Sequence, residues 1–268
     1  MGFYEQKQGE LLYYKSDCIR EPHGFTTRKG GVSTGDFASM NLGVRRGDDR
    51  ECVLKNYEIL GGAIGFDPKK LVGAVQVHRD DVRVVTKEDW GKGLYLHTDY
   101  EADGLVTDVP GTALMVYSAD CGTLLFSDEK TGAVGACHAG WRGTALGIAG
   151  KTVETMEKAF GTRPSDLTVA LGPCIGACCF ETDSDVPEAM IAALGDDAKT
   201  AISQQGDKFY VNLKAINRLW LLRAGVLPER IDVSPLCTAC DKEIFWSHRR
   251  HGDRRGSLAA VIAAGGKP

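Results

Sequence analysis

The chain has 268 residues, of which 43% are hydrophobic and 25% charged, and its formal net charge is −4. A chain of this length buries a core without needing disulfides, and the composition is that of an ordinary globular protein. The mildly negative charge excludes a protein whose whole surface attracts nucleic acid or an anionic membrane. One local basic patch remains, HRRHGDRR at 248–255.

The cysteines and the apolar runs bear on where the protein works. The nine cysteines are an odd number, and the N-terminal stretch has no basic segment followed by an apolar run of the secretory kind. No apolar run reaches the ~18 residues that a bilayer span needs. The sequence therefore predicts a protein of the reducing cytoplasm, whose cysteines are free, buried or bound to metal.

The expected secondary structure mixes strands and helices in one domain over residues 1–268. A Gly-rich loop covers 26–49, and a helical spacing that ends in glycine predicts a helix over 51–65. Further helices are expected at 144–160 and 215–225, and 256–264 fits either a strand or a helix. Strands are expected at 71–78, 82–86, 102–107, 113–120, 123–128, 133–139 and 166–172. This pattern predicts an α/β (α+β) fold with mixed β-sheets flanked by helices.

Three potential metal ligands come at the ends of three predicted strands: His78, Cys121 and His138. If the strands share one sheet, the three side chains meet at one edge of it. Two imidazoles and a thiolate suit Zn²⁺, and a fourth position left open marks a catalytic site. Each residue could equally be a buried side chain without a ligand role, because Cys is among the most buried types. Their spacings match no local metal signature.

A second set of cysteines lies in CIGACC and CTAC, at Cys174, Cys178, Cys179, Cys237 and Cys240. The outer cysteines of CIGAC together with the two of CTAC could form a four-thiolate structural zinc site. The stretch PCIGAC approaches the P-C-x-x-C half of the zinc nucleobase deaminases, but it has one residue too many and no H-x-E accompanies it. We therefore discount that deaminase fold.

Two arginines are candidates for binding an anion. Arg28 lies beside two glycines in TRKGG, and Arg142 precedes Gly143 and Thr144 at the start of a predicted helix. A helix N-terminus with a nearby Arg suits phosphate, although a solvated Arg in a surface turn would have the same sequence. The chain contains no Walker A, G-x-G-x-x-G or G-x-S-x-G motif, which argues against a nucleoside triphosphate, a dinucleotide and a serine hydrolase.

Longer motifs occur in a fixed order: TTRKGGVS, QVH, SADC, HAGWRGT, GPCIGACCFE and CTACDKEIFWSHRR. Together they resemble the YfiH-like family, also labelled polyphenol oxidase or laccase-domain proteins, over about residues 20–262. The resemblance implies that His78, Cys121 and His138 bind one zinc ion. It implies a single α/β domain related to the cytotoxic-necrotizing-factor-like cysteine hydrolases. It also implies purine nucleoside phosphorolysis, with adenosine deamination and methylthioadenosine phosphorolysis as companion activities.

On this hypothesis the partners are purine nucleosides and phosphate, with no nucleic acid or membrane, and a homodimer is left open. Arg28 or Arg142 would orient the phosphate that attacks C1′ of the ribose. Asn41 would hold a ribose hydroxyl or simply cap a turn. In deamination, hydroxide activated by zinc attacks C6 of adenosine. Asp120, next to Cys121, would then carry the proton, or it would only hold the turn.

Two alternatives from other classes stay open. A single-copper phenol oxidase is compatible with one Cys and two His. A multicopper laccase is not, because the chain has six His and none of them forms a His-x-His pair. The other alternative is a zinc-stabilised binding protein without turnover. A closed four-thiolate site would favour that protein, whereas an open metal position with saturable nucleoside binding would favour an enzyme.

Overall fold

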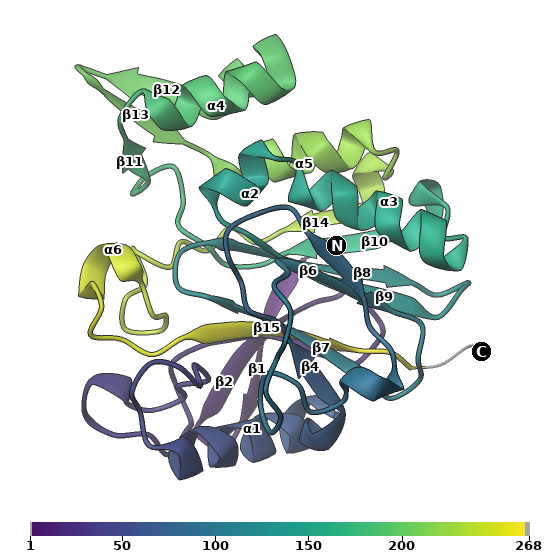
Figure 1. Cartoon of the computed structure of the whole chain (residues 1–268). Helices are drawn as coiled ribbons and strands as arrows, with labels where there is room; N and C mark the ends of the chain where they lie inside the picture. The colour runs from purple at the N-terminus through teal and green to yellow at the C-terminus, as the bar shows by residue number, and fades with distance from the viewer. Residues whose placement is uncertain (1, 266–268) are drawn as a thin grey trace.

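The computed structural model describes residues 2–265, and two six-stranded sheets lie face to face in it (Figure 1). The first sheet has the order β1-β2-β3-β15-β7-β4, and the second has the order β14-β10-β8-β9-β6-β5. Each sheet contains both parallel and antiparallel pairs; β4 runs parallel to β7, for example, and β5 to β6. The expected α/β architecture with mixed sheets is therefore confirmed.

The first sheet takes five strands from the first 118 residues and its sixth from the last strand of the described chain. They are β1 (Phe3–Gln8), β2 (Leu11–Ser16), β3 (His23–Thr26), β4 (Leu71–Gly73), β7 (Ala113–Ser118) and β15 (Leu258–Ala263). Residues 256–264, which fitted either a strand or a helix, thus supply the central strand β15, paired with β3 on one side and β7 on the other.

The second sheet consists of strands from the middle of the chain. They are β5 (Val82–Val84), β6 (Gly104–Thr107), β8 (Gly122–Asp128), β9 (Ala133–Ala139), β10 (Thr168–Leu171) and β14 (Ile231–Val233). β8 and β9 are buried along their whole length. A strand that is covered on both faces has no solvent side, which explains why apolar residues follow one another without alternation at 124–126 and 133–137.

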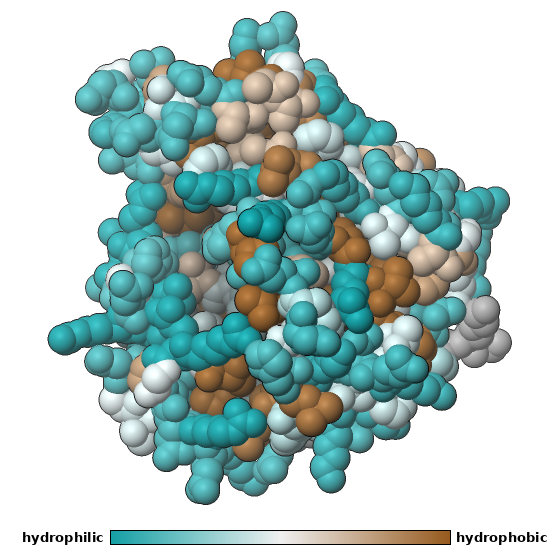
Figure 2. Space-filling model, viewed as in Figure 1, coloured by the Kyte–Doolittle hydropathy of each residue, from teal (hydrophilic) through white to brown (hydrophobic). Residues whose placement is uncertain are grey.

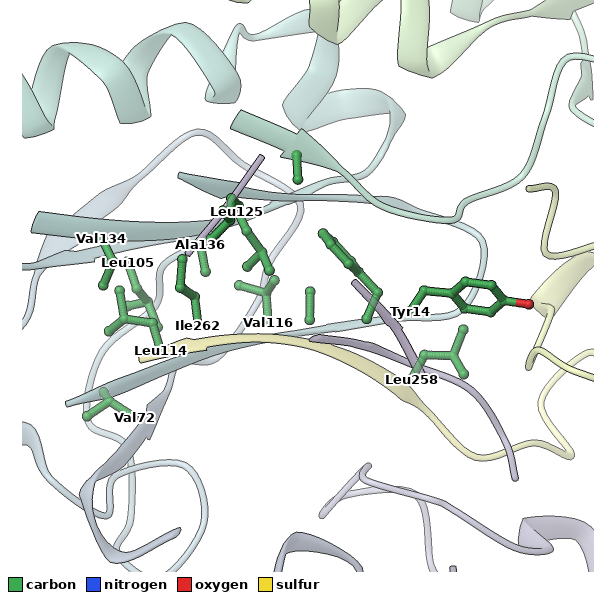
Figure 3. Packing of buried hydrophobic residues seen from close by; sticks show 14 of the residues in the cluster. Tyr14, Val72, Leu105, Leu114, Val116, Leu125, Val134, Ala136, Leu258 and Ile262 are labelled. Carbon is green, nitrogen blue, oxygen red and sulfur yellow. The ribbon is translucent and has the colours of Figure 1, made fainter. Parts of the chain in front are cut away.

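The main core lies between the two sheets. Leu114 and Val116 project from the first sheet toward Leu105, Leu125 and Val134 of the second (Figure 3). Each of these side chains is at most 2% exposed. Burying a side chain of this size stabilises the fold by roughly 1.5–3 kcal/mol, so the inner faces hold the two sheets together.

Helix α1 (Arg50–Ile64) covers the outer face of the first sheet, as the spacing over 51–65 predicts. The Asp49 side chain caps its first turn by accepting from the backbone N–H groups of Glu51 and Cys52. The helix ends at Gly65, whose φ of 95° lies in the left-handed region that glycine tolerates. Val53, Tyr57 and Leu60 form its buried face.

The helix expected over 144–160 is two helices, α2 (Trp141–Ala145) and α3 (Ile148–Phe160), which cover the second sheet together with α5 (Leu213–Arg223). The break falls at Gly147, whose φ is 82°. A Cβ there would lie 3.2 Å from the Trp220 ring. The Trp220 indole also donates a hydrogen bond to the Thr144 carbonyl oxygen, at 2.8 Å, so a contact with α5 sets the break.

A small three-stranded sheet lies at one end of the molecule (Figure 1). It contains β11 (Glu181–Thr182), β12 (Ile202–Gln205) and β13 (Lys208–Val211), and it packs with α4 (Asp185–Leu194). Hydrophilic residues cover most of the face in Figure 2, and hydrophobic ones gather near the top, where α4 lies. In residues 2–265 no helix combines the length and the apolar character of a membrane span.

The structure differs from the sequence-based expectation for one strand and describes part of the expected domain. The strand predicted over 71–78 ends at Gly73, so residues 74–78 leave the sheet. The predicted single domain over 1–268 includes Met1 and residues 266–268, which lie outside the described part. Within that part, the core between the sheets contains side chains from Tyr14 through Ala264.

Candidate metal site and adjoining pocket

The structure brings His78, Cys121 and His138 together. The ligand atoms of the three side chains all lie within 4.8 Å of one another. The two imidazole rings meet edge to face, with centroids 4.7 Å apart and an interplanar angle of 83°. Two imidazoles and one thiol at this spacing can bind one metal ion from three sides.

The expectation that the three ligands end strands of one sheet is wrong. His78 lies in the segment that follows β4 of the first sheet, whereas His138 lies within β9 of the second. Cys121 occupies the short turn in which the chain passes from β7 in the first sheet to β8 in the second. The cluster forms where the two sheets meet, because a sandwich can bring loops of both sheets to the same end.

Asp103, just before β6, holds two of the three ligands in place. Its Oδ1 atom lies 2.7 Å from Nδ1 of His138. Its carboxylate also accepts hydrogen bonds from the backbone N–H groups of Val77, His78 and Arg79, at 2.9–3.1 Å. A carboxylate behind a ligating histidine fixes the ring and makes its other nitrogen a better ligand. The sequence analysis missed this residue.

Strained backbone also marks the cluster. His78, with φ 61°, and Asp120, with φ 90°, are the non-glycine residues with positive φ in the described part of the chain. Such conformations cost on the order of 1–3 kcal/mol each and concentrate at functional sites. One of them is a proposed ligand and the other immediately precedes Cys121.

Because Gly140 has no side chain, the space between the three ligands stays free. A Cβ at this position would lie 2.7 Å from Nδ1 of His78 and 3.3 Å from Sγ of Cys121. Any other residue would therefore push a side-chain atom among the donors. Donor chemistry and free space both fit one small metal ion, and they fit zinc or copper equally well.

The charges around the cluster favour cation binding. Burial and the neighbouring His138 lower the pKa of His78, which favours the neutral imidazole that a metal requires. Burial also lowers the pKa of His138, but Cys121 and Asp103 outweigh it and raise the value to about 9. Burial alone would raise the pKa of Asp103. His138 and the backbone donors have the larger effect and lower the pKa below its usual value, so this carboxyl is ionised.

A pocket of about 320 Å³ opens beside the cluster. Two of the proposed ligands, His78 and Cys121, line it directly. The remaining walls combine apolar and cationic side chains, and they include Trp141, Ile175, Phe180, Leu213, His248, Arg249 and Arg255. Pockets that bind small molecules typically pair apolar surfaces with a few polar groups in this way.

Two arginines of this pocket come from the basic stretch 248–255. The Arg249 guanidinium already donates to the carbonyl oxygens of Cys179 and Glu181. Arg255 has a freer guanidinium, because its Nε atom has no hydrogen-bond partner among the described residues. Burial and the neighbouring Arg46 lower the pKa of Arg255 to about 10, so the side chain is still charged at neutral pH. The basic patch was the sequence signal for both residues.

Asp120 lines the pocket, but its carboxylate is engaged in the fold. It accepts hydrogen bonds from the hydroxyls of Thr238 and Ser247 and from the backbone N–H of Arg249, at 2.6–3.0 Å. These contacts tie the turn at Cys121 to the segment that carries the pocket arginines. The sequence left two roles open for Asp120, carrying a proton or holding the turn. Its three hydrogen bonds support the second role.

The three other residues named from the sequence lie outside the set that lines the pocket. Arg28 donates to the carbonyl oxygens of Ala38 and Lys242 and stacks on Trp246 at 3.9 Å. Asn41 is fully buried and bonds Asp48 and the backbone N–H groups of Gly43 and Ser257. Arg142 is exposed and stacks on Trp141, at 4.2 Å, so it is the nearest of the three to the pocket wall.

The second cysteine set forms a cluster whose membership differs from the expected one. Cys178, Cys179, Cys237 and Cys240 place their sulfur atoms within 4.8 Å of one another. Cys174, expected in this set, is buried, and its thiol points to the Ile175 carbonyl oxygen. A backbone bridge pairs Cys174 with Cys237, so the two residues are neighbours although Cys174 is outside the cluster.

The fold and this three-ligand cluster define a class of proteins with two packed mixed sheets and a His-Cys-His site between them. A family model described as "Multi-copper polyphenol oxidoreductase laccase" matches residues 22–265. The chain therefore belongs to this family, which includes the YfiH and YlmD proteins.

Relatives in this family carry the name purine nucleoside phosphorylase. The chain is 40% identical over 242 residues to "Purine nucleoside phosphorylase YlmD" of Geobacillus stearothermophilus, which covers 89% of this chain and 88% of the relative. It is 36% identical over 237 residues to "Purine nucleoside phosphorylase YfiH" of Escherichia coli, covering 88% and 91%. The crystal structure of YlmD from G. stearothermophilus superimposes with a TM-score of 0.91, at 37% identity, over 97% of this chain and 98% of that one.

Proposed function

We propose that this protein is a zinc-dependent purine nucleoside phosphorylase. The observation that carries the proposal is the His78, Cys121 and His138 cluster, which opens into a pocket with apolar walls and a partly free arginine. The names of the relatives support the same activity. A zinc ion held by the three ligands would supply Lewis-acid chemistry at the end of the pocket.

The pocket offers one kind of surface to the purine of a nucleoside and another to the attacking phosphate. Trp141 and Phe180 offer flat apolar surfaces for a purine ring, and Arg255 offers a charged donor for phosphate. In phosphorolysis a phosphate oxygen forms a bond to C1′ of the ribose while the bond from C1′ to the purine nitrogen breaks. The leaving purine keeps the electron pair and takes up a proton. Arg255 would hold the phosphate at the required distance. It joins Arg28 and Arg142, the two candidates from the sequence, and Arg142 lies beside the pocket residue Trp141.

Adenosine deamination and methylthioadenosine phosphorolysis belong to the proposal as companion activities. Deamination needs a group that moves a proton near the metal ligands. Asp120 has the right position, but three hydrogen bonds already hold its carboxylate. Phosphorolysis therefore has the stronger support. The relation to cytotoxic-necrotizing-factor-like hydrolases, the ribose contact of Asn41 and a homodimer stay predictions.

One incubation tests the proposal. The zinc-loaded protein is mixed with adenosine and phosphate, and the products are separated by chromatography, with His138→Ala as the matched control. We expect adenine and ribose 1-phosphate from the wild type and neither from the variant. Methylthioadenosine in place of adenosine should release adenine as well.

Each other result of the incubation would support a different function. Inosine without adenine would indicate a deaminase, and hypoxanthine would indicate both activities in sequence. Uptake of dioxygen with a phenol, only in copper-loaded protein, would support the oxidase. No product from protein that holds zinc would reject the nucleoside activities and favour a binding protein.

A further inference from the structure

Four cysteines outside the pocket are arranged like the ligands of a metal. The sulfur atoms of Cys178 and Cys240 are 3.6 Å apart, and those of Cys179 and Cys240 are 3.5 Å apart. A tetrahedral zinc ion with Zn–S bonds of about 2.3 Å separates its sulfurs by ~3.8 Å. A disulfide requires about 2.05 Å. We propose that Cys178, Cys179, Cys237 and Cys240 hold a second zinc ion in a closed four-thiolate site.

The backbone around Cys237 suits a thiolate ligand. Its sulfur accepts a hydrogen bond from the Gly176 N–H, at 3.1 Å. Groups that hydrogen-bond a ligand orient it and adjust its charge. Gly176 is also required by space, because a Cβ there would lie 3.2 Å from Sγ of Cys178 and 3.3 Å from Cβ of Cys237.

A cation lies next to the cluster. Four thiolates and one Zn²⁺ carry a net charge of about −2, which needs compensation near a protein surface. Nη2 of Arg250 lies 3.6 Å from Sγ of Cys179, and Nε of the same guanidinium donates to the Ala239 carbonyl oxygen at 2.9 Å. The guanidinium is therefore fixed between the two cysteine pairs.

The proposed ion joins two segments that are far apart in sequence. Cys178 and Cys179 lie between β10 and β11, and Cys237 and Cys240 lie between β14 and α6 (His248–His251). The first segment supplies Phe180 to the pocket wall and the second leads to Arg249. An Arg249 hydrogen bond to the Cys179 carbonyl oxygen already links them, at 3.1 Å. The ion would clamp this wall, whereas the ion at His78 would face the pocket.

Counting the zinc bound to variants of each site tests the proposal. After zinc loading and removal of free metal, we expect two zinc ions per wild-type chain and one in Cys237→Ser/Cys240→Ser. His78→Ala, which damages the other site, should also retain one. Cys52→Ser changes a free cysteine outside both clusters and should retain two. A Cys237/Cys240 variant with as much zinc as the wild type would overturn the proposal.

X-ray absorption on a second variant covers the case in which the cysteine variant does not fold. In His78→Ala/His138→Ala all four cysteines remain, so any bound zinc should show four sulfur neighbours at about 2.3 Å. Absence of zinc from this folded variant, or nitrogen among its neighbours, would contradict the four-thiolate site. Neither measurement depends on turnover, so failure of the proposed activity would be seen separately.

Discussion

Oδ1 of Asp103 lies 2.7 Å from Nδ1 of His138, and the same carboxylate accepts the backbone N–H of His78. One buried group therefore positions both histidines of the candidate metal site, although they belong to segments of different sheets. Nδ1 of His138 is engaged by this contact, which leaves the other ring nitrogen for a metal.

Replacing Asp103 by Asn should weaken metal binding without removing a ligand. The amide lacks the negative charge and offers one oxygen where the carboxylate offers two, so His138 loses its anionic partner and the turn at His78 loses an acceptor. We expect roughly 10- to 100-fold lower zinc affinity, measured by competition with a chromophoric chelator. Asp108→Asn, which changes the next acid in the chain, just after β6, should leave the affinity unchanged. Equal affinities in both variants would show that Asp103 is not a positioning residue.

Gly140→Ala should abolish metal binding at the cluster of His78, Cys121 and His138 by filling that site. The new methyl group would lie 2.7 Å from Nδ1 of His78, closer than the Cβ atoms of folded proteins approach other heavy atoms. Gly62→Ala is the matched control, because its Cβ meets nothing within 4 Å on helix α1. We expect normal zinc content and equal or higher stability in the control. Full zinc content in Gly140→Ala would place the ion elsewhere.

Arg255→Gln should raise the KM for phosphate more than the KM for the nucleoside. A hydrogen bond to a charged group contributes about 1.5–3 kcal/mol, which corresponds to roughly a ten- to hundredfold change. The zinc content should not change, because Arg255 is not among the proposed ligands. Arg254→Gln removes an exposed neighbour with the same charge and should behave as wild type. An equal rise of the phosphate KM in both variants would show that Arg255 acts only through its charge and does not contact the phosphate.

Stability should fall as the pH drops from 6.5 toward 4 because of His23. This buried imidazole accepts the Ser16 N–H and contacts the Glu21 carbonyl oxygen, and burial lowers its pKa to about 4. The unfolded chain binds a proton near pH 6.5, so the unfolded state takes up more protons between these values and stability rises with pH. His23 should contribute about 2 kcal/mol less at pH 5 than at pH 7.5.

The matched variant for this effect is His23→Gln, which keeps a neutral donor and acceptor but cannot be protonated. Urea unfolding of both proteins at the two pH values isolates His23, because all other titrating groups are shared. The loss of stability between pH 7.5 and pH 5 should be smaller in the variant. An identical loss would show that His23 does not titrate differently in the folded state.

The sequence predicts local structure best where one segment determines it. The helix over 51–65 has its own cap at Asp49 and its own glycine stop at Gly65, so it needed no partner to be recognised. The two helices predicted as one over 144–160 are separated by a contact with Trp220, which lies 76 residues from its partner Thr144. A break set by a distant residue leaves no pattern in the local spacing.

The candidate site shows the same limit. His78, Cys121 and His138 stand out because each follows an apolar run, but the sequence could not show that the runs belong to two sheets. Asp103 has its partners 24 to 35 residues away, so nothing near it in the chain signals its role. Asn41 and Arg28 lie in a loop whose glycines suggested ligand binding, yet the structure shows bonds within the protein.

The passage of the chain between sheets at Cys121 has a consequence for how this protein tolerates change. Because His78 follows a strand of one sheet, His138 belongs to the other and Cys121 lies in the turn between them, the separation of the donors depends on how the sheets are packed. A substitution such as Leu125→Ala, within the interior and away from the pocket, would alter that spacing. Selection for a working metal site would thus also restrict residues of the core. Substitutions that accumulate between the sheets would change the metal affinity before they unfold the protein.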